Sequence, residues 1–296
     1  MRLDRLITLG VAHPLRRTFA RGDGASVPIL MYHSVSADPE PGVAAYYRTT
    51  TSPAVFQQQI RWLRDAGYHS MDLPVLVEQV RQQQPLPAKT VVITFDDGFR
   101  DFYTNAFPVL REHRFTATVF LPTAFIGSAR HSFKEKECLT WNEVAELRQR
   151  GISFGSHTVN HPRLIELSWR EIETELSASK RELEQRLGEP VSTFAHPYAF
   201  PQTDVEYVRM FKKLLIQVGY TCCATTEIGR LRPGADPYRL KRLPVNSLDD
   251  SALLAAKLDG AYDWLAGAQA FVKRCKQFVG PARGTSEAPL ANVSSN

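Results

Sequence analysis

Short apolar runs alternate with longer amphipathic segments along most of this chain. The runs have the length of buried β-strands, and the segments between them repeat apolar residues at helical spacing. Strands are predicted at 27–33, 68–71, 91–95, 116–121, 152–155, 192–196, 220–224 and 240–245. Helices are predicted at 53–66, 73–83, 105–113, 141–150, 169–187 and 205–218. Such repeated alternation predicts a mostly parallel sheet with covering helices.

The ends of several predicted helices carry recognisable signals. Residues 140–143 (Thr-Trp-Asn-Glu) have the sequence of a capping box. Gly67, Gly151, Gly188 and Gly219 each lie just past a helical pattern, where a left-handed backbone suits glycine.

The number of strand–helix units, about eight, favours a closed barrel over an open sheet. The predicted fold class is therefore α/β, a distorted (β/α) barrel of the TIM-like kind over residues 27–250. Residues 1–26 form an N-terminal lead-in, and residues 251–280 form an appended helical region. Residues 281–296 form a polar tail that is expected to be disordered.

Composition narrows the class of protein. A chain of 296 residues with 43% hydrophobic content can bury one large core. Its formal charge of +5 is mildly basic, but Lys and Arg form no stripe interleaved with aromatic residues, which argues against nucleic acid as a partner. The four cysteines include the adjacent Cys222 and Cys223 and form no C-x-x-C pair, so buried free thiols are expected.

The sequence suggests no export signal. The N-terminus has a basic start, but its apolar stretch is short and is broken by His13 and Pro14. No run approaches the length of a membrane span. We therefore expect a cytoplasmic protein and leave peripheral membrane contact open, because Tyr262, Trp264 and Leu265 lie near a basic segment at 273–276. Packing of these residues against the barrel is the favoured alternative, and the oligomeric state is left open.

Polar residues worth naming lie at the exits of predicted strands, namely His33, Asp96, Asp97, His157 and His196. In a parallel barrel all strand exits gather at one face, where active sites are built. Residues far apart in sequence are therefore expected to converge there.

Asp97, His157 and His161 are the predicted metal ligands. One carboxylate and two imidazoles suit Zn²⁺, and such a set with open positions also accepts Fe²⁺, Co²⁺ or Ni²⁺. Two adjacent carboxylates are costly unless a cation neutralises the pair. Asp96, the carboxylate left over, is the predicted general base, because a metal would lower the pKa of its bound water enough for an ordinary carboxylate to accept the proton. The alternatives are a polar turn at the aspartates, a helix cap at Asp96 and a surface pair of histidines.

Tyr198 follows Pro197, which fixes the turn before it. The backbone N–H of Tyr198 is the predicted donor to an oxyanion. The alternative is a loop that merely closes the strand.

At these residues the chain resembles the polysaccharide deacetylases, the NodB-like family 4 of carbohydrate esterases. The motif T-F-D-D-G is similar to 94–98, the motif H-[ST]-x-x-H to 157–161, and the R-x-P-Y-like loop to 195–198. The resemblance extends over about 27–245 and includes I-L-M-Y-H-S-V at 29–35. It looks like the branch that acts on poly-N-acetylglucosamine and other exopolysaccharides.

The resemblance implies a distorted barrel, a divalent metal on Asp97, His157 and His161, and Asp96 as the catalytic base. It implies hydrolysis of N-acetyl groups from an amino-sugar polysaccharide or its precursor, which releases acetate and makes the N-acetylated glycan the partner. An O-acetyl esterase and an inactive glycan-binding relative are the alternatives.

The chain departs from the family pattern at two places. Many members have an arginine that pairs with the base where this chain has Ala195, so another group must pair with Asp96 or its pKa is lowered less. Many members also take their general acid from a C-terminal L-x-H motif, but the stretch here is 242–246, Arg-Leu-Pro-Val-Asn. We therefore predict His33 as the proton donor, because the exopolysaccharide branch resembles a circular shift of the motifs. His196 is the second candidate.

Overall fold

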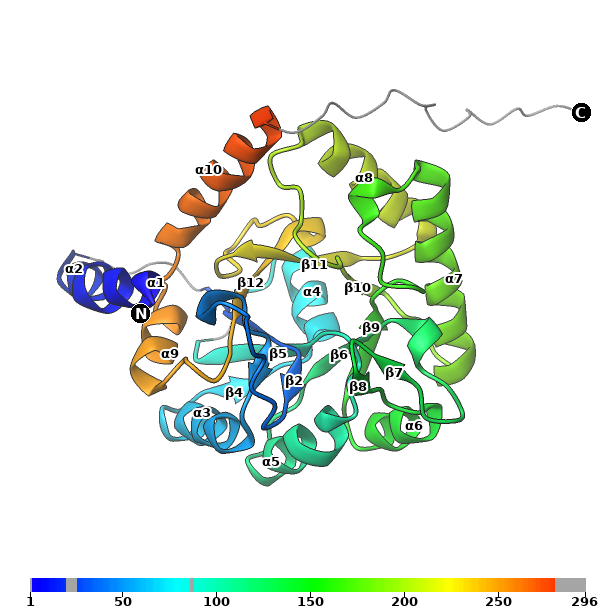
Figure 1. The fold of residues 1–296 in the computed structure, drawn as a ribbon, viewed down its shortest axis with the longest axis horizontal. Coiled ribbons are helices and arrows are strands. Elements are labelled where there is room, and N and C mark those ends of the chain that lie inside the picture. The colour runs from blue at the N-terminus through cyan, green and yellow to red at the C-terminus, as the bar shows by residue number, and fades with distance from the viewer. Residues whose placement is uncertain (1, 20–25, 86–87, 280–296) are drawn as a thin grey trace, which may run out of the picture.

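The computed structural model describes residues 2–19, 26–85 and 88–279. The tail expected at 281–296 lies outside these residues. Seven parallel strands close into a barrel in the order β1-β12-β11-β10-β9-β6-β5, because β1 pairs with both β12 and β5. The predicted (β/α) barrel is confirmed, and Figure 1 shows helices surrounding the ring of strands.

Each predicted strand overlaps an observed one. The strands of the main sheet are β1 (Ile29–Tyr32), β4 (His69–Ser70), β5 (Thr90–Phe95), β6 (Thr118–Leu121), β9 (Ser153–Ser156), β10 (Thr193–Ala195), β11 (Cys222–Ile228) and β12 (Leu240–Pro244). Every residue of β5 is buried, as expected for a parallel strand covered on both faces. Two further strand pairs lie outside the barrel, β2 (Ser34–Val35) with β3 (Thr50–Thr51) and β7 (Ser132–Phe133) with β8 (Lys136–Glu137).

The predicted helices are also present. The helices around the barrel are α3 (Pro53–Asp65), α4 (Leu73–Arg81), α5 (Phe107–Glu112), α6 (Trp141–Gln149), α7 (Trp169–Leu187) and α8 (Val205–Val218). The capping box before α6 is formed, with Glu143 N–H donating to Thr140 Oγ1 and Thr140 N–H donating to the Glu143 carboxylate. Gly188 and Gly219 end α7 and α8 in the left-handed conformation.

The helix predicted at 105–113 differs at its start. A π-helical turn at Phe102–Ala106 precedes α5. Pro108 has no N–H to donate to the carbonyl four residues earlier, which explains why a regular α-helix does not run through this segment.

The C-terminal region forms two helices, α9 (Ser251–Leu258) and α10 (Trp264–Val279). Leu253, Leu254 and Leu258 of α9 belong to the same hydrophobic core as the barrel strands, and so does Tyr262, which is fully buried. The packing alternative for the 262–265 segment is therefore the one observed. No helix in the described part of the chain combines the length and apolar character needed to cross a bilayer.

Residues 3–19 form an element that the sequence analysis treated only as part of a lead-in. It consists of α1 (Leu3–Ile7), a π-helical turn at Thr8–Ala12 and α2 (His13–Phe19). It lies beside α9 at the edge of the molecule (Figure 1). The cysteines described, Cys138, Cys222 and Cys223, are buried free thiols, as predicted.

Candidate metal centre and active site

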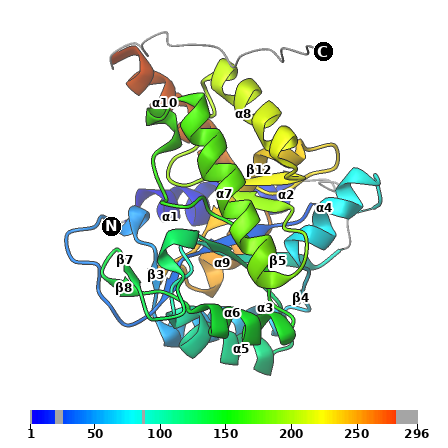
Figure 2. The same cartoon turned by 90° about the vertical axis from the view of Figure 1, so that its right-hand side faces the viewer.

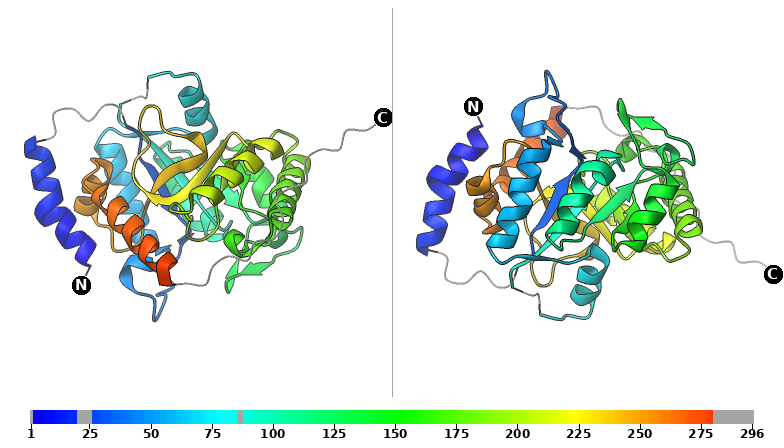
Figure 3. Two further views of the ribbon diagram at one scale, coloured as in Figure 1. Left: turned by 90° about the horizontal axis from the view of Figure 1, so that it is seen from above. Right: turned by 90° about the horizontal axis from the view of Figure 1, so that it is seen from below.

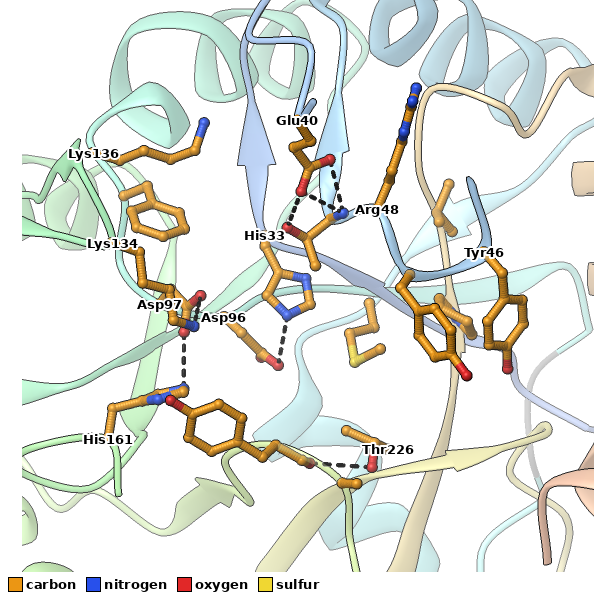
Figure 4. Close-up of a pocket in the computed structure, with 18 of the residues that line it drawn as sticks. His33, Glu40, Tyr46, Arg48, Asp96, Asp97, Lys134, Lys136, His161 and Thr226 are labelled. Carbon is orange, nitrogen blue, oxygen red and sulfur yellow. Dashed lines mark hydrogen bonds and ion pairs between the residues drawn. The ribbon is translucent and has the colours of Figure 1, made fainter. Parts of the chain in front are cut away.

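The side chains singled out from the sequence lie together at one end of the barrel. Four of them belong to strand exits, with His33 after β1, Asp96 and Asp97 after β5, and His157 after β9. They line a cavity of about 850 Å³ together with His161, His196 and Tyr198. Figure 4 shows this cavity, with His33, Asp96, Asp97 and His161 gathered on one side.

Asp97, His157 and His161 direct one donor atom each toward a common point. Asp97 Oδ1 lies 3.0 Å from His161 Nε2 and 3.6 Å from His157 Nε2. All three residues are buried, and the donor atoms lie within 4.8 Å of one another. The predicted ligands therefore form a cluster that can hold a divalent ion.

The tautomer of His157 is fixed by the barrel wall. Its Nδ1 lies 2.8 Å from the carbonyl oxygen of Ala195, which can only accept, so Nδ1 carries the proton. Nε2 then presents a lone pair to the cluster. Burial lowers the pKa of His157 to about 3, so this imidazole is neutral at physiological pH.

The backbone is strained where it delivers these residues. Asp97, Thr158, His161 and Tyr198 all have positive φ, between 52° and 70°. Non-glycine residues adopt this region rarely, and such residues cluster at functional sites. Gly98 follows Asp97 with φ of 62°, and a Cβ there would lie 2.8 Å from a side-chain carbon of β6, so this turn requires glycine.

Asp96 has a partner that the sequence analysis left unnamed. Arg242, on β12, donates from Nη1 to Oδ1 at 2.7 Å and from Nη2 to Oδ2 at 2.8 Å. The guanidinium is buried and also donates to Thr94 Oγ1 and to the carbonyl of Thr225. Arg242 thus supplies the cation that many family members place at the position of Ala195.

This ion pair controls the charge of Asp96. Burial alone would raise the pKa of the carboxyl, but Arg242 outweighs it and holds the pKa below its usual range. Asp96 is therefore ionised at neutral pH. Arg242 lies next to Lys241 in a strand of mixed character, so the local sequence does not single it out as the partner of Asp96.

Lys134 is a second cation at the site that sequence reasoning missed. It lies in the turn between β7 and β8, and its Nζ is 3.0 Å from Asp97 Oδ2. Burial would raise the pKa of Asp97, but the hydrogen bond with His161 and the charge of Lys134 lower it overall. An exposed turn lysine has no feature in the sequence that predicts this contact.

The two candidate proton donors have different surroundings. His33 Nε2 lies 3.9 Å from Asp96 Oδ2 at the edge of the cavity (Figure 4). Burial lowers the pKa of His33 despite the nearby carboxylate. His196 is buried among the rings of Phe200 and Phe211, and its Nε2 is 3.2 Å from the hydroxyl of Tyr207.

Tyr198 borders the cluster from the loop after β10. Its ring packs edge-on against the ring of His161, with 4.7 Å between the centroids. The side chain is 41% exposed, and the cations of Lys134 and Arg163 lie over its ring. The carbonyl of Tyr198 accepts a hydrogen bond from Thr226 Oγ1, which ties this loop to β11.

Comparison with known proteins identifies the family. Residues 83–221 match the family profile described as polysaccharide deacetylase. The protein YxkH of Bacillus subtilis is 30% identical over 222 residues, which cover 75% of this chain and 72% of YxkH. Its name gives the same family and no particular substrate. The chain belongs to the polysaccharide deacetylase family.

Two further relatives are similar over most of the chain. The poly-β-1,6-N-acetyl-D-glucosamine N-deacetylase of Staphylococcus epidermidis is 28% identical over 214 residues, covering 69% of this chain and 71% of that protein. The structure of the Streptococcus pyogenes deacetylase PplD in complex with acetate superposes with a TM-score of 0.69 at 27% identity, covering 79% of this chain and 99% of PplD.

Proposed function

We propose that this protein is a metal-dependent N-deacetylase of an amino-sugar polysaccharide or its precursor. The observation that carries the proposal is the buried cluster of Asp97, His157 and His161, which lies beside an ionised Asp96 on the wall of one cavity. Family membership and the name of the S. epidermidis relative support the amino-sugar substrate.

The donor set fits a divalent ion such as Zn²⁺. Two imidazole nitrogens and one carboxylate oxygen form the three-ligand set of catalytic sites, which leaves positions for water and substrate. When bound, the ion polarises the acetyl carbonyl and lowers the pKa of water. Co²⁺, Ni²⁺ and Fe²⁺ suit the same donors, so the availability of each metal in the cell would determine which ion is bound.

Asp96 is the proposed general base. Arg242 holds both of its oxygens in a fixed orientation, and the carboxylate is desolvated at the cavity wall. A carboxylate of ordinary basicity suffices to accept a proton from an activated water. Arg242 keeps the base ionised between turnovers.

His33 is the proposed proton donor to the departing amine. It lines the cavity, and a proton accepted by Asp96 needs to travel only a short distance to reach it. Because the pKa of His33 is lowered, its protonated form gives the proton up readily. His196 is the weaker candidate because Tyr207 and the surrounding rings enclose it.

The N–H of Tyr198 is the proposed donor to the oxyanion. The left-handed backbone at Tyr198 and the Thr226 contact orient this loop beside the cluster. Farther out, the partly buried ring of Tyr46 and the exposed ring of Tyr47 line the cavity, where sugar rings can stack (Figure 4).

The experiment is an assay of free amine released from β-1,6-linked N-acetylglucosamine oligomers with added Zn²⁺ or Co²⁺. We expect release that a chelator abolishes and that Asp96→Asn reduces by about 10³-fold, within the range attributed to a general base. Amine release equal in the wild type and in Asp96→Asn would contradict the proposal. Release of acetate only from O-acetylated xylan oligomers would indicate an esterase instead.

A further inference from the structure

The N-terminal helical segment Leu3–Phe19 has the reverse of the usual polarity. Figure 3 shows this segment lying along the side of the barrel, with its long axis exposed at the edge of the molecule. A surface helix normally buries its apolar face and exposes its polar face. Here the polar Asp4 and Thr8 are buried against the protein, beside the partly buried Leu9, while several large apolar side chains are exposed.

Several hydrogen bonds and ion pairs hold the inner face. The hydroxyl of Tyr262 donates to Asp4 Oδ2 at 2.7 Å, and Trp264 Nε1 donates to Thr8 Oγ1 at 3.1 Å. Both Asp4 and Thr8 are buried. These contacts attach the segment to Tyr262, which is buried, and to Trp264, which is partly buried.

The ion pairs extend this attachment along the helix. Arg5 forms a two-pronged pair with Asp250 at 2.7 and 2.8 Å. His13 lies 3.4 Å from Asp259, and Arg16 donates to the backbone carbonyl of that same residue. The polar face is thus fixed against α9 and the residues that follow it.

The outer face presents large apolar side chains to solvent. Leu3 is 68% exposed, Leu6 46%, Val11 53% and Leu15 52%. Gly10 and Pro14, which are also exposed, lie between these residues in the sequence and carry no charge. A contiguous apolar stripe on a helix held this firmly indicates an interaction surface.

The exposed carboxylates beside the stripe, Asp250 and Asp259, are engaged by Arg5 and His13 of the segment. The only acidic residue of the segment, Asp4, is buried and paired with Arg2. Arg17 is exposed at the end of the stripe, next to the partly exposed Arg16. The exposed part of the segment therefore complements a negatively charged surface.

We propose that the outer face of Leu3–Phe19 docks this protein on the surface of an anionic lipid bilayer. The helix would lie in the plane of the interface, with Leu3, Leu6, Val11 and Leu15 at the headgroup–acyl boundary. A second copy of the chain fits less well, because four side chains at about half exposure offer far less than the roughly 800 Å² per partner of a standard interface.

This docking would leave the cavity open. Arg2 Nη1 lies 2.9 Å from Asp249 Oδ1, shortly after the carboxyl end of β12, so the first helical turn lies at the cavity end of the barrel. Figure 2 shows the helical segment running back from that end along the barrel's side. A bilayer against this side would lie next to the mouth of the cavity and not across it.

The test is co-sedimentation of the full-length protein with lipid vesicles. One set contains phosphatidylcholine alone, and the other contains phosphatidylcholine with phosphatidylglycerol at 3:1. We expect at least about tenfold stronger partitioning to the anionic vesicles. Leu6→Ser/Leu15→Ser is expected to weaken it about tenfold or more, because both side chains would leave the apolar boundary.

The matched control is Val205→Ser/Ile216→Ser on α8, where the two side chains are 78% and 52% exposed. It should change partitioning less than about twofold, and Leu3→Ser/Val11→Ser should repeat the loss seen with the first pair. Amine release from soluble oligomers should be unchanged in all of these variants, which separates this test from that of the proposed function.

Three results would overturn the proposal. The first is wild-type protein that does not partition to anionic vesicles or partitions equally to both kinds. The second is an equal loss in the α8 control. The third is a wild-type dimer in sedimentation equilibrium that Leu6→Ser/Leu15→Ser converts to a monomer, because a second copy would then be the occupant.

Discussion

Asp96 and Asp97 are neighbours in sequence and are almost equally buried, but their surroundings differ. Both oxygens of Asp96 accept hydrogen bonds from Arg242. Asp97 instead presents Oδ1 to two imidazoles, and Lys134 reaches only its other oxygen. The positive φ of Asp97 turns the chain between them, so the two carboxylates face different groups.

The difference separates two chemical roles that would otherwise conflict. Two carboxylates so close together cannot both stay ionised without compensation. The cation of Arg242 stabilises the ionised form of Asp96, which the proposed base role requires, and leaves Asp97 to face the imidazoles of the candidate metal site. The comparison predicts that changes on the Asp96 side affect charge and stability, whereas changes on the Asp97 side affect metal binding.

Arg242→Gln should have the largest effect on stability. It leaves Asp96 buried without its cation, and breaking a buried pair in this way costs about 3–5 kcal/mol. The measurement is the free energy of unfolding in urea at pH 7. The double variant Asp96→Asn/Arg242→Gln should recover most of the lost unfolding free energy, because it also removes the buried negative charge. If the double variant is as unstable as Arg242→Gln, the unpaired charge of Asp96 is not the cause of the loss.

His33→Ala should reduce turnover of the N-acetyl substrate about a hundredfold, since a proton donor contributes in this range. His196→Ala should cost less than about tenfold, because Tyr207 and aromatic rings enclose that side chain. Metal content must be equal in both proteins when kcat is compared. Full activity of the His33→Ala variant would show that His33 is not the proton donor.

The Arg242→Gln variant should also reverse the pH dependence that Asp96 contributes. In the wild type its pKa is lowered, so its contribution to stability is present above the unfolded pKa of about 3.9 and is lost as the pH falls through the folded value. Without Arg242 burial dominates and raises the pKa, so the contribution is lost as the pH rises.

The stability difference between wild type and Arg242→Gln should therefore be smaller at pH 4.5 than at pH 7.5. We expect it to shrink by at least about 1.4 kcal/mol, the equivalent of one pKa unit. Urea unfolding at the two pH values provides the measurement. A difference that stays constant or grows toward acid would contradict the assignment of Asp96 as the affected group.

Lys134→Ala should have the smallest effect. Removing a cation 3.0 Å from Asp97 Oδ2 should tighten Zn²⁺ binding, by only about two- to fivefold because Lys134 is partly exposed and screened. Competition with a chromophoric chelator measures the Kd. Lys136→Ala is the control, since Lys136 pairs with Asp38 instead, and an equal change in both variants would show a general charge effect.

The sequence predicted most of the fold because strand and helix signals are local. It also predicted the ligand cluster, since Asp97, His157 and His161 lie in short motifs at strand exits that a parallel barrel brings together. Roles within the site, such as those of His33 and Tyr198, remain predictions.

Other features could not be predicted from local patterns. Arg242 lies 146 residues from Asp96, and only the closure of β1 between β5 and β12 brings them together. Lys134 reaches Asp97 from an exposed turn. The N-terminal helical segment was missed because its apolar stretch is short and is broken by His13 and Pro14, and a π-helical turn interrupts the regular spacing.

The most direct test of the central claim is the metal content of three proteins dialysed against Zn²⁺ and then against metal-free buffer. We predict about one equivalent in the wild type and in Asp96→Asn, and less than about a tenth in Asp97→Asn, because only Asp97 is a ligand. Asp97→Asn binding as much Zn²⁺ as the wild type, or Asp96→Asn losing it, would contradict the division between the two carboxylates.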